Sequence, residues 1–119
     1  MSSLARIVVE QHGAFPVVAI EGEVDASNAT EISRSIDAAL SNHSIALVVD
    51  LTETGYLDSA GINLLFALGA RLRDRQQRLL LVVDPASPVA RIVAISGLAV
   101  AERTEETRAA ALEQAHAGL

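Results

Sequence analysis

The stretch Asp58-Ser59-Ala60-Gly61 places a hydroxyl side chain between two apolar segments. A serine in such a place can act as a nucleophile, accept a phosphate group, or cap a helix by accepting a hydrogen bond from its first N–H groups. Asp and Ser are both preferred at helix starts, so Asp58 and Ser59 are both candidate caps. Each of these functions requires different neighbours.

A nucleophilic serine needs a base beside it, and the sequence offers only three histidines. His12 falls in a predicted turn, His43 in a predicted loop and His116 among the last residues of the chain. The stretch also lacks the Gly-x-Ser-x-Gly pattern of an α/β-hydrolase. Hydrolytic chemistry at Ser59 is therefore disfavoured.

Other common catalytic and binding motifs are missing or weak. Every basic residue is an arginine, so a phosphate loop with its lysine is excluded, and no Gly-x-Gly-x-x-Gly follows a predicted strand. The absence of cysteine excludes thiolate zinc sites and cysteine nucleophiles. Glu21, Glu23 and Asp25 alternate along an extended segment and could bind a metal, but a solvated acidic strand end is the favoured interpretation.

Phosphorylation of Ser59 is physically permissible, because a helix N-terminus favours negative charge by about 0.3–1 kcal/mol. Adding roughly −1.5 to −2 charges would change the surface without melting the helix. Thr52 and Thr54, in the same predicted loop, are alternative acceptors. Asp50, Glu53 and Asp58 are expected to form an acidic rim at the C-terminal ends of strands, where an arginine-bearing partner could bind.

The spacing of apolar residues predicts the elements on either side of Ser59. Residues 45–51 are almost continuously aliphatic, as in a strand buried on both faces. Residues 59–72 carry apolar side chains at three- and four-residue intervals, which predicts an amphipathic helix. Ser59 is therefore expected at a junction between a strand and a helix.

The remaining segments predict an α/β fold with a mixed sheet of four to five strands and about four helices. Residues 4–11 and 17–23 form an N-terminal antiparallel hairpin around a turn containing Gly13 and Pro16. The other predicted elements are a helix within 25–40 capped by Asp25, Ser27 or Asn28, a strand at 78–84, a helix at 89–95 that Gly97 ends, a short strand near 98–102, and a helix at 104–117.

Composition limits the kinds of partner. The 119 residues include only three aromatic side chains, and the net charge is −6 with the arginines scattered, so direct binding of nucleic acid is disfavoured. Half of the residues are hydrophobic, yet no apolar run reaches the roughly 18–20 residues of a membrane span. We expect one soluble domain without membrane insertion, located in the cytoplasm.

Several short motifs follow one another along the chain: Glu21-Gly22-Glu23-Val24-Asp25, Val48-Val49-Asp50-Leu51, Leu57-Asp58-Ser59-Ala60-Gly61, Ser87-Pro88 and Ser96-Gly97-Leu98. In this order, they resemble the STAS domain family and within it the bacterial anti-sigma factor antagonists. The resemblance covers nearly the whole chain and implies a single STAS domain over residues 1–119.

The resemblance implies a regulatory binding protein that is not an enzyme and needs no cofactor. The unphosphorylated form would bind an anti-sigma factor that is a serine kinase, and the sigma factor would be released. The kinase would phosphorylate Ser59, and a metal-dependent phosphatase of the PP2C type would reverse the modification. By the same resemblance, the partner surface would include Asp25, Asp58, Ser59 and Gly61.

Two other interpretations remain open. A STAS scaffold in a stressosome-like or lipid-transport assembly would use Ser59 only as a cap, and Ser59→Ala would then cost about 0.5–2 kcal/mol. An enzyme or small-ligand binder is the other alternative, which the missing base and phosphate loop disfavour. Asn63 and Phe66 stand where the family often has small residues, so the surface near Ser59 is expected to suit a different partner.

Overall fold

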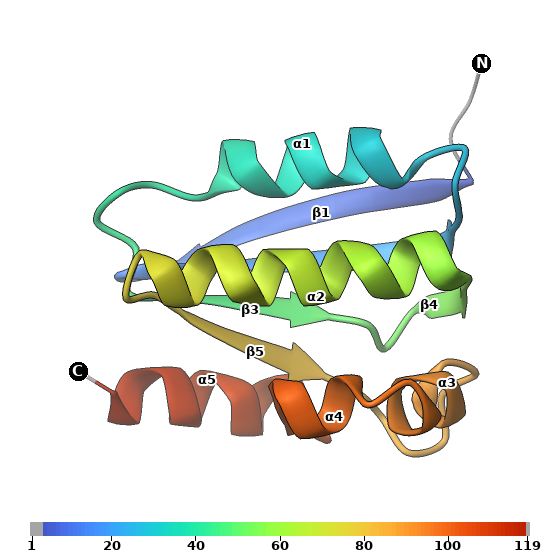
Figure 1. Ribbon diagram of the computed structural model, residues 1–119. Helices are drawn as coiled ribbons and strands as arrows, with labels where there is room; N and C mark the ends of the chain where they lie inside the picture. Colours follow the sequence, from blue (N-terminus) through green and yellow to red (C-terminus); the bar gives the residue numbers. More distant parts are fainter. Residues whose placement is uncertain (1–3, 119) are drawn as a thin grey trace.

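In the computed structural model, which describes residues 4–118, six strands form one mixed sheet between two layers of helices (Figure 1). The strands are β1 (Ala5–His12), β2 (Phe15–Val24), β3 (Ala46–Asp50), β4 (Thr54–Leu57), β5 (Arg78–Val82) and β6 (Arg103–Glu105). The helices are α1 (Ala29–Ala39), α2 (Ser59–Asp74), α3 (Ala90–Ile95), α4 (Leu98–Ala101) and α5 (Arg108–Ala117).

The sheet has the order β1-β2-β3-β5-β6, and β4 pairs with β2 away from this path. β1 and β2 form an antiparallel hairpin whose turn contains Gly13 at a positive φ of 65°. The pairs β2–β3, β2–β4, β3–β5 and β5–β6 are all parallel. The predicted α/β class, mixed sheet and N-terminal hairpin are confirmed.

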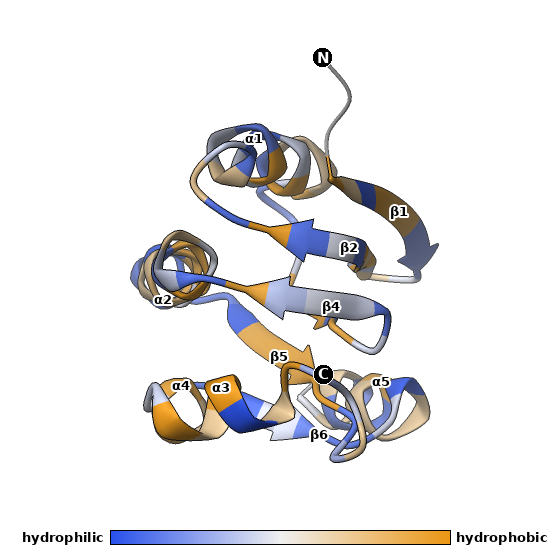
Figure 2. Ribbon diagram, turned by 90° about the vertical axis from the view of Figure 1, so that its right-hand side faces the viewer, coloured by the Kyte–Doolittle hydropathy of each residue, from blue (hydrophilic) through white to orange (hydrophobic). Residues whose placement is uncertain are grey.

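Alternate residues of the central strand β3 enter two separate cores. Leu47 and Val49 belong to the larger core, to which α1 and α2 contribute, whereas Ala46 and Val48 pack with Ala111 of α5. Figure 2 shows α1 and α2 on one side of the strands and α5 on the other. A side chain on β3 therefore faces either the α2 layer or the α5 layer, according to whether its position is odd or even.

The ten-residue strand β2 is long enough to pair with two strands in succession. Its first part pairs with β3 as far as Ala19, and its last part pairs with β4 from Gly22 to Val24. The register of the β2–β4 pair shifts between Gly22 and Glu23, and Gly22 has a φ of +107°. This irregularity places β4, and with it the start of α2, beside the C-terminal end of β2.

Two local predictions were wrong. Residues 98–102 were expected to form a strand, but Leu98–Ala101 is the short helix α4, and the strand β6 begins at Arg103. Leu98 is buried while Val100 is 92% exposed, so Leu98–Ala101 buries only its first residue rather than one side of an extended strand. The loop after β3 contains the unpredicted strand β4, which brings the sheet to six strands rather than four to five. Residues 4–118 contain five helices, where about four were expected.

No helix within residues 4–118 is both long and apolar enough to cross a membrane.

Substituting Gly22 should destabilise the protein at the point where β2 changes partner. A Cβ at Gly22 would collide with the carbonyl oxygen of Leu4, and the positive φ adds strain, so Gly22→Ala should cost about 2–4 kcal/mol in unfolding free energy. Gly13→Ala is the matched control, because Gly13 also has a positive φ but no atom within 4 Å of an added Cβ. Its expected cost is about 1–2 kcal/mol. Equal costs in urea unfolding would contradict the steric account.

Candidate functional site

Asp58, rather than Ser59, is the N-cap of α2. Asp58 Oδ1 accepts a hydrogen bond from the backbone N–H of Gly61 at 3.0 Å, and the Asp58 backbone is extended, as expected of a capping residue. Ser59 is the first residue of the helix, its side chain is exposed, and its hydroxyl has no hydrogen-bond partner within residues 4–118. The prediction that Ser59 caps the helix is therefore wrong, and its hydroxyl is free for another role.

The second oxygen of Asp58 connects the start of α2 to the turn between β2 and α1. Asp58 Oδ2 accepts a hydrogen bond from the backbone N–H of Ala26 at 3.3 Å, and the Asp58 N–H donates to the carbonyl of Val24 at 3.1 Å. One carboxylate thus joins two loops that are 32 residues apart in sequence. Asp25 and Ser59 are consequently placed at the same end of the molecule.

The turn that carries Asp25 is ordered by its own polar side chains. Asp25 Oδ1 accepts hydrogen bonds from Ser27 Oγ at 2.5 Å and Ser27 N at 2.9 Å, and these bonds hold the pKa of Asp25 below its ordinary value. Asn28 is buried and spans the turn, since its amide accepts from Asp25 N and donates to the carbonyl of Glu23. Asn28 is the N-cap residue of α1, but its side chain makes no capping bond there.

Gly61 is buried at the contact between α2 and β2. A Cβ at Gly61 would lie 3.1 Å from the Leu57 side chain and 3.2 Å from both the side chain and the carbonyl oxygen of Val24. The glycine therefore allows a close approach of the helix to the strand. A contribution of Gly61 to partner binding remains a prediction, and its buried position makes that contribution indirect.

Asp50 does not join Asp58 in the acidic rim that was expected of Asp50, Glu53 and Asp58. Asp50 is an even-numbered residue of β3, like Ala46 and Val48, and it lies on the α5 side of the sheet. It pairs with Ala19 of β2, five residues before Val24, which corresponds to roughly 16 Å along the strand. The reason for the error is the pairing of β2 with β4, because it moves Asp58 beyond the end of β3.

Asp50 is instead held by a cation of its own. Arg108 Nε donates to Asp50 Oδ2 at 2.9 Å, while Arg108 Nη1 donates to Glu10 Oε2 at 2.8 Å. Burial raises the pKa of Asp50, but hydrogen bonds from Thr52 and the Arg108 guanidinium outweigh this effect and leave the pKa below its ordinary value. Asp50 therefore joins the start of α5 to the sheet.

The two alternative phosphoacceptors are less available than Ser59. Thr54 is fully buried, and its hydroxyl donates to the carbonyl of Ile20 at 2.6 Å. Thr52 is half-buried, and its hydroxyl donates to Asp50 Oδ1 at 2.6 Å. Of these three hydroxyls, only that of Ser59 is both exposed and unbonded.

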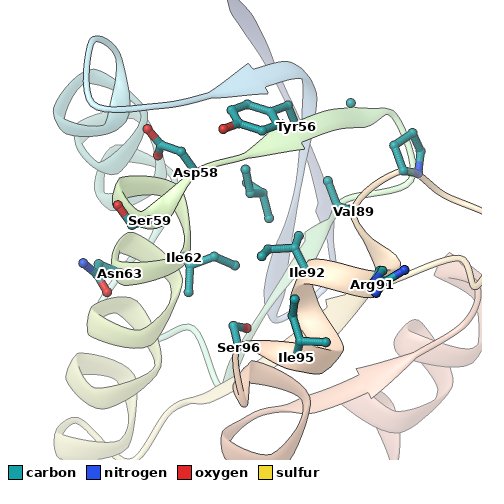
Figure 3. Close-up of a pocket in the computed structure, with 13 residues that line it drawn as sticks. Tyr56, Asp58, Ser59, Ile62, Asn63, Val89, Arg91, Ile92, Ile95 and Ser96 are labelled. Atoms are coloured by element: carbon teal, nitrogen blue, oxygen red, sulfur yellow. The ribbon is translucent and has the colours of Figure 1, made fainter.

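A groove of about 610 Å³ lies between the start of α2 and helix α3, and we call it the α2–α3 groove. Its lining residues are Gly55, Tyr56, Leu57, Asp58, Ser59, Ile62, Asn63, Pro88, Val89, Arg91, Ile92, Ile95 and Ser96. Figure 3 shows Ser59 on the α2 side of the groove, with Ile62 and Ile92 pointing toward each other across it. Ser59 is therefore at the edge of an apolar depression.

The contribution of α3 to the groove could not be predicted from the sequence. Ile92 and Ile95 are three residues apart in a short helix, and this spacing alone does not distinguish a core contact from a surface groove. Of the two residues expected to alter the surface near Ser59, Asn63 is exposed and lines the groove, whereas Phe66 packs against the larger core. Any effect on partner choice is therefore expected from Asn63.

The histidines lie at the other end of the sheet from Ser59. His12 pairs with Phe15 at the start of β2, and the His116 ring packs edge-on against the Phe15 ring with centroids 5.1 Å apart. His43 precedes β3. Within residues 4–118, no group of three His, Cys, Asp or Glu side chains could hold a metal ion. Glu21, one of the three acidic residues considered as metal ligands, has its Oε1 atom 3.9 Å from Nη1 of Arg6.

Comparison with known proteins gives a family match and a set of similar antagonists. Residues 7–104 match the family described as "Mlab, STAS domain". An anti-sigma-B factor antagonist of Listeria monocytogenes is 34% identical over 62 residues, which cover 52% of this chain and 54% of the relative. The anti-sigma-F factor antagonist RsfB of Mycobacterium tuberculosis is 29% identical over 66 residues. The chain spans about half the length of these relatives.

Solved structures extend the similarity over nearly the whole chain. An anti-sigma factor antagonist from Mycobacterium paratuberculosis has a TM-score of 0.80 and 26% identity, and the match covers 94% of both chains. The antagonist SpoIIAA in its unphosphorylated form has a TM-score of 0.76 at 19% identity over 94% of this chain and 97% of its own. The second match shows a common fold.

Removing the Asp58 side chain should cost more stability than removing the Ser59 hydroxyl. Asp58→Ala loses the helix cap and the bond to Ala26, so it should lower the unfolding free energy by about 1–2 kcal/mol. Ser59→Ala removes an exposed, unbonded hydroxyl and should change it by less than about 0.5 kcal/mol. Urea unfolding of both variants measures the difference. A larger loss from Ser59→Ala would restore the capping role to Ser59.

Asp50→Asn should destabilise the protein at neutral pH through the loss of a charged hydrogen bond. The expected loss is about 1.5–3 kcal/mol, because Asp50 is buried and bonded to Arg108. A lowered pKa in the folded state means that the carboxylate stabilises the protein above its ordinary pKa of 3.8 and loses this effect as the pH falls through the folded value. The gap between wild type and variant should therefore be constant above about pH 5 and should narrow at pH values below 3.8.

The exposed pair of Asp37 with Arg71 supplies the control for Asp50. Asp37→Asn should change the unfolding free energy by less than about 1 kcal/mol. A gap between wild type and Asp50→Asn that widens on acidification would contradict the assignment.

Proposed function

Because this chain belongs to the STAS domain family, we propose that it is an anti-sigma factor antagonist whose binding is switched off by phosphorylation of Ser59. The supporting observation is the state of Ser59, which is exposed, unbonded and placed at the edge of the α2–α3 groove. The names of the relatives and of the structural neighbours support the same class of activity. The role requires binding and no catalysis by this chain.

In the proposed cycle, the unphosphorylated protein binds an anti-sigma factor of the serine-kinase type, which then releases its sigma factor. The binding surface contains Ser59, Asp58 and the Asp25 turn, which Asp58 holds in place through Ala26. Asp25 and Asp58 have no arginine partner within the described chain, whereas Asp37, Asp50 and Glu102 do. These two carboxylates, which have no cationic partner in the described chain, are suited to a basic side chain of the kinase.

Phosphorylation at Ser59 is compatible with an intact fold. The first N–H groups of a helix have no acceptor within the helix and favour a neighbouring anion. Asp58 satisfies the N–H of Gly61, so a phosphate on Ser59 would lie next to the remaining first-turn N–H groups. The modification would therefore alter the surface while the cap and the core stay in place. A phosphatase of the PP2C type would restore the binding form.

A non-phosphorylated scaffold is the second candidate. The family match is described by the name Mlab, and a sulfate transporter family protein from Wolinella succinogenes shares the fold at a TM-score of 0.72 and 14% identity. In a stressosome-like or lipid-transport assembly, the partner would bind without regard to charge at Ser59. The scaffold interpretation was expected to use Ser59 as the helix cap, but the capping residue is Asp58.

The two candidates predict different behaviour of Ser59 variants. We expect Ser59→Glu to fold normally and to lose binding to a kinase-type anti-sigma factor by at least about five-fold, because a coupling of 1–3 kcal/mol corresponds to about 5–150-fold. Ser59→Ala should keep the binding and should accept no phosphate from the kinase and ATP. Titration calorimetry with the purified kinase measures the affinity, and mass spectrometry locates the phosphate.

Thr52→Ala provides the control, since its hydroxyl is engaged by Asp50. It should be phosphorylated as the wild type is. Equal affinity of wild type and Ser59→Glu would favour the scaffold, and phosphate found on Thr52 would overturn the assignment of the switch residue.

A further inference from the structure

The surface next to Ser59 is unusually apolar for an exposed region. Tyr56 is 52% exposed and Ile95 is 69% exposed, and both line the α2–α3 groove together with the half-buried Ile92. The floor is closed by buried side chains of Leu57, Ile62 and Val89. A volume of about 610 Å³ is enough for several side chains of a partner.

The charges around the groove indicate the chemistry of its occupant. Two carboxylates lie on the α2 side: that of Asp58, and that of Asp25, whose turn is joined to Asp58 by the hydrogen bond from Ala26. Neither carboxylate has an arginine partner among the described residues. The hydrogen bonds from Ser27 lower the pKa of Asp25 below its ordinary value and so favour its charged form. The only cation that lines the groove, Arg91, is on α3. An apolar segment with a basic residue toward α2 fits both features.

Resting on the proposed function, we propose that the α2–α3 groove receives an apolar side chain of the anti-sigma factor, beside a basic residue that faces Asp25 and Asp58. We further propose that phosphate on Ser59 expels this segment because the phosphate must stay hydrated at the edge of the groove. The contact therefore combines apolar burial, which gives affinity, with a charge pair, which gives orientation.

This mechanism differs from a general repulsion between acidic surfaces. The occupant is basic, so long-range forces from an added phosphate would attract it. Docking, however, would strip water from a group carrying roughly −1.5 to −2 charges next to apolar side chains. Dehydrating a charge costs several kcal/mol unless it finds a well-placed partner. Exclusion by hydration depends little on salt, because the charge is adjacent to the contact and is not screened over a distance.

A pair of surface variants tests whether the partner binds in the α2–α3 groove. Ile95→Ser removes an exposed apolar side chain from the groove, and Val100→Ser removes a more exposed one that lies outside it on α4. With the purified kinase-type anti-sigma factor that binds wild type, Ile95→Ser should weaken binding by at least about ten-fold, as for a central contact. Val100→Ser should bind within two- to three-fold of wild type, which is about 0.6 kcal/mol or less. Equal binding by wild type and Ile95→Ser would overturn the inference.

The single tyrosine gives a direct reading of the groove. Tyr56 is the only tyrosine of the chain, so replacing it with 3-fluorotyrosine yields one ¹⁹F resonance from a lining residue. Unlabelled anti-sigma factor should shift this resonance, and the shift should be absent after phosphorylation of Ser59 at both 0.05 M and 0.5 M salt. An unshifted resonance in a formed complex, or recovery of the phosphorylated protein's binding at high salt, would contradict the proposal.

The outcomes separate this inference from the proposed function. If wild type binds the kinase and Ser59→Glu does not, the proposed function stands whatever Ile95→Ser does. If Ile95→Ser then binds as wild type does, only the groove inference fails. If wild type binds no anti-sigma factor of the kinase type, the proposed function fails and the groove inference, which rests on it, fails with it.

Discussion

The position of the candidate site depends on the strand β2, which pairs with two parallel neighbours in turn. β3 accompanies it only as far as Ala19, and β4 takes over from Gly22. Gly22 makes this change possible, because its positive φ and lack of a side chain let the carbonyl of Leu4 approach. As a result, α2 starts beside Val24 and the Asp25 turn rather than at the end of β3. The position of Ser59 at the edge of the α2–α3 groove follows from this placement.

Asp50 and Asp58 lie on opposite faces of the sheet and differ in their partners. On the α5 side, Arg108 pairs with both Asp50 and Glu10 and joins the last helix to the sheet. On the α2 side, Asp58 satisfies backbone N–H groups and leaves its charge without an arginine partner in the described chain. Asp50 thus contributes to stability, whereas Asp58 both caps α2 and carries a charge that the proposed partner can meet. In the proposed switch, a change of charge at Ser59 adds to the charge of Asp58 and leaves the Asp50–Arg108 pair unaffected.

Much of the fold could be predicted from the sequence. The aliphatic run of β3 and the periodic apolar residues of α2 are long and unambiguous, and Gly13 and Gly97 mark real chain reversals at positive φ. The four residues of β4 and the single turn of α4 could not be predicted, because such short segments carry too little periodicity to distinguish strand from helix. Their conformation is decided by what they pack against.

Only part of the candidate site could be predicted from the sequence. Ser59 and Asp58 lie together at the start of α2, and the hydrogen bond from Ala26 to Asp58 brings the Asp25 turn beside them. The sequence could not tell which of two adjacent polar residues caps α2, since both types are good caps. Nor could it place Asp50, whose direction depends on the register of β3 against its neighbours, or bring α3 against α2 to form a groove.

In the proposed switch, the charge on Ser59 decides which partner binds and leaves the fold unchanged. The most direct test is to prepare the protein with phosphoserine at position 59 and to measure both its urea unfolding and its affinity for the kinase-type anti-sigma factor. We expect unfolding free energies of the two forms within about 1 kcal/mol of each other, in keeping with a favourable helix N-terminus. Affinity should fall by at least about five-fold. Equal affinities, or a loss of affinity that is matched by unfolding, would contradict the account.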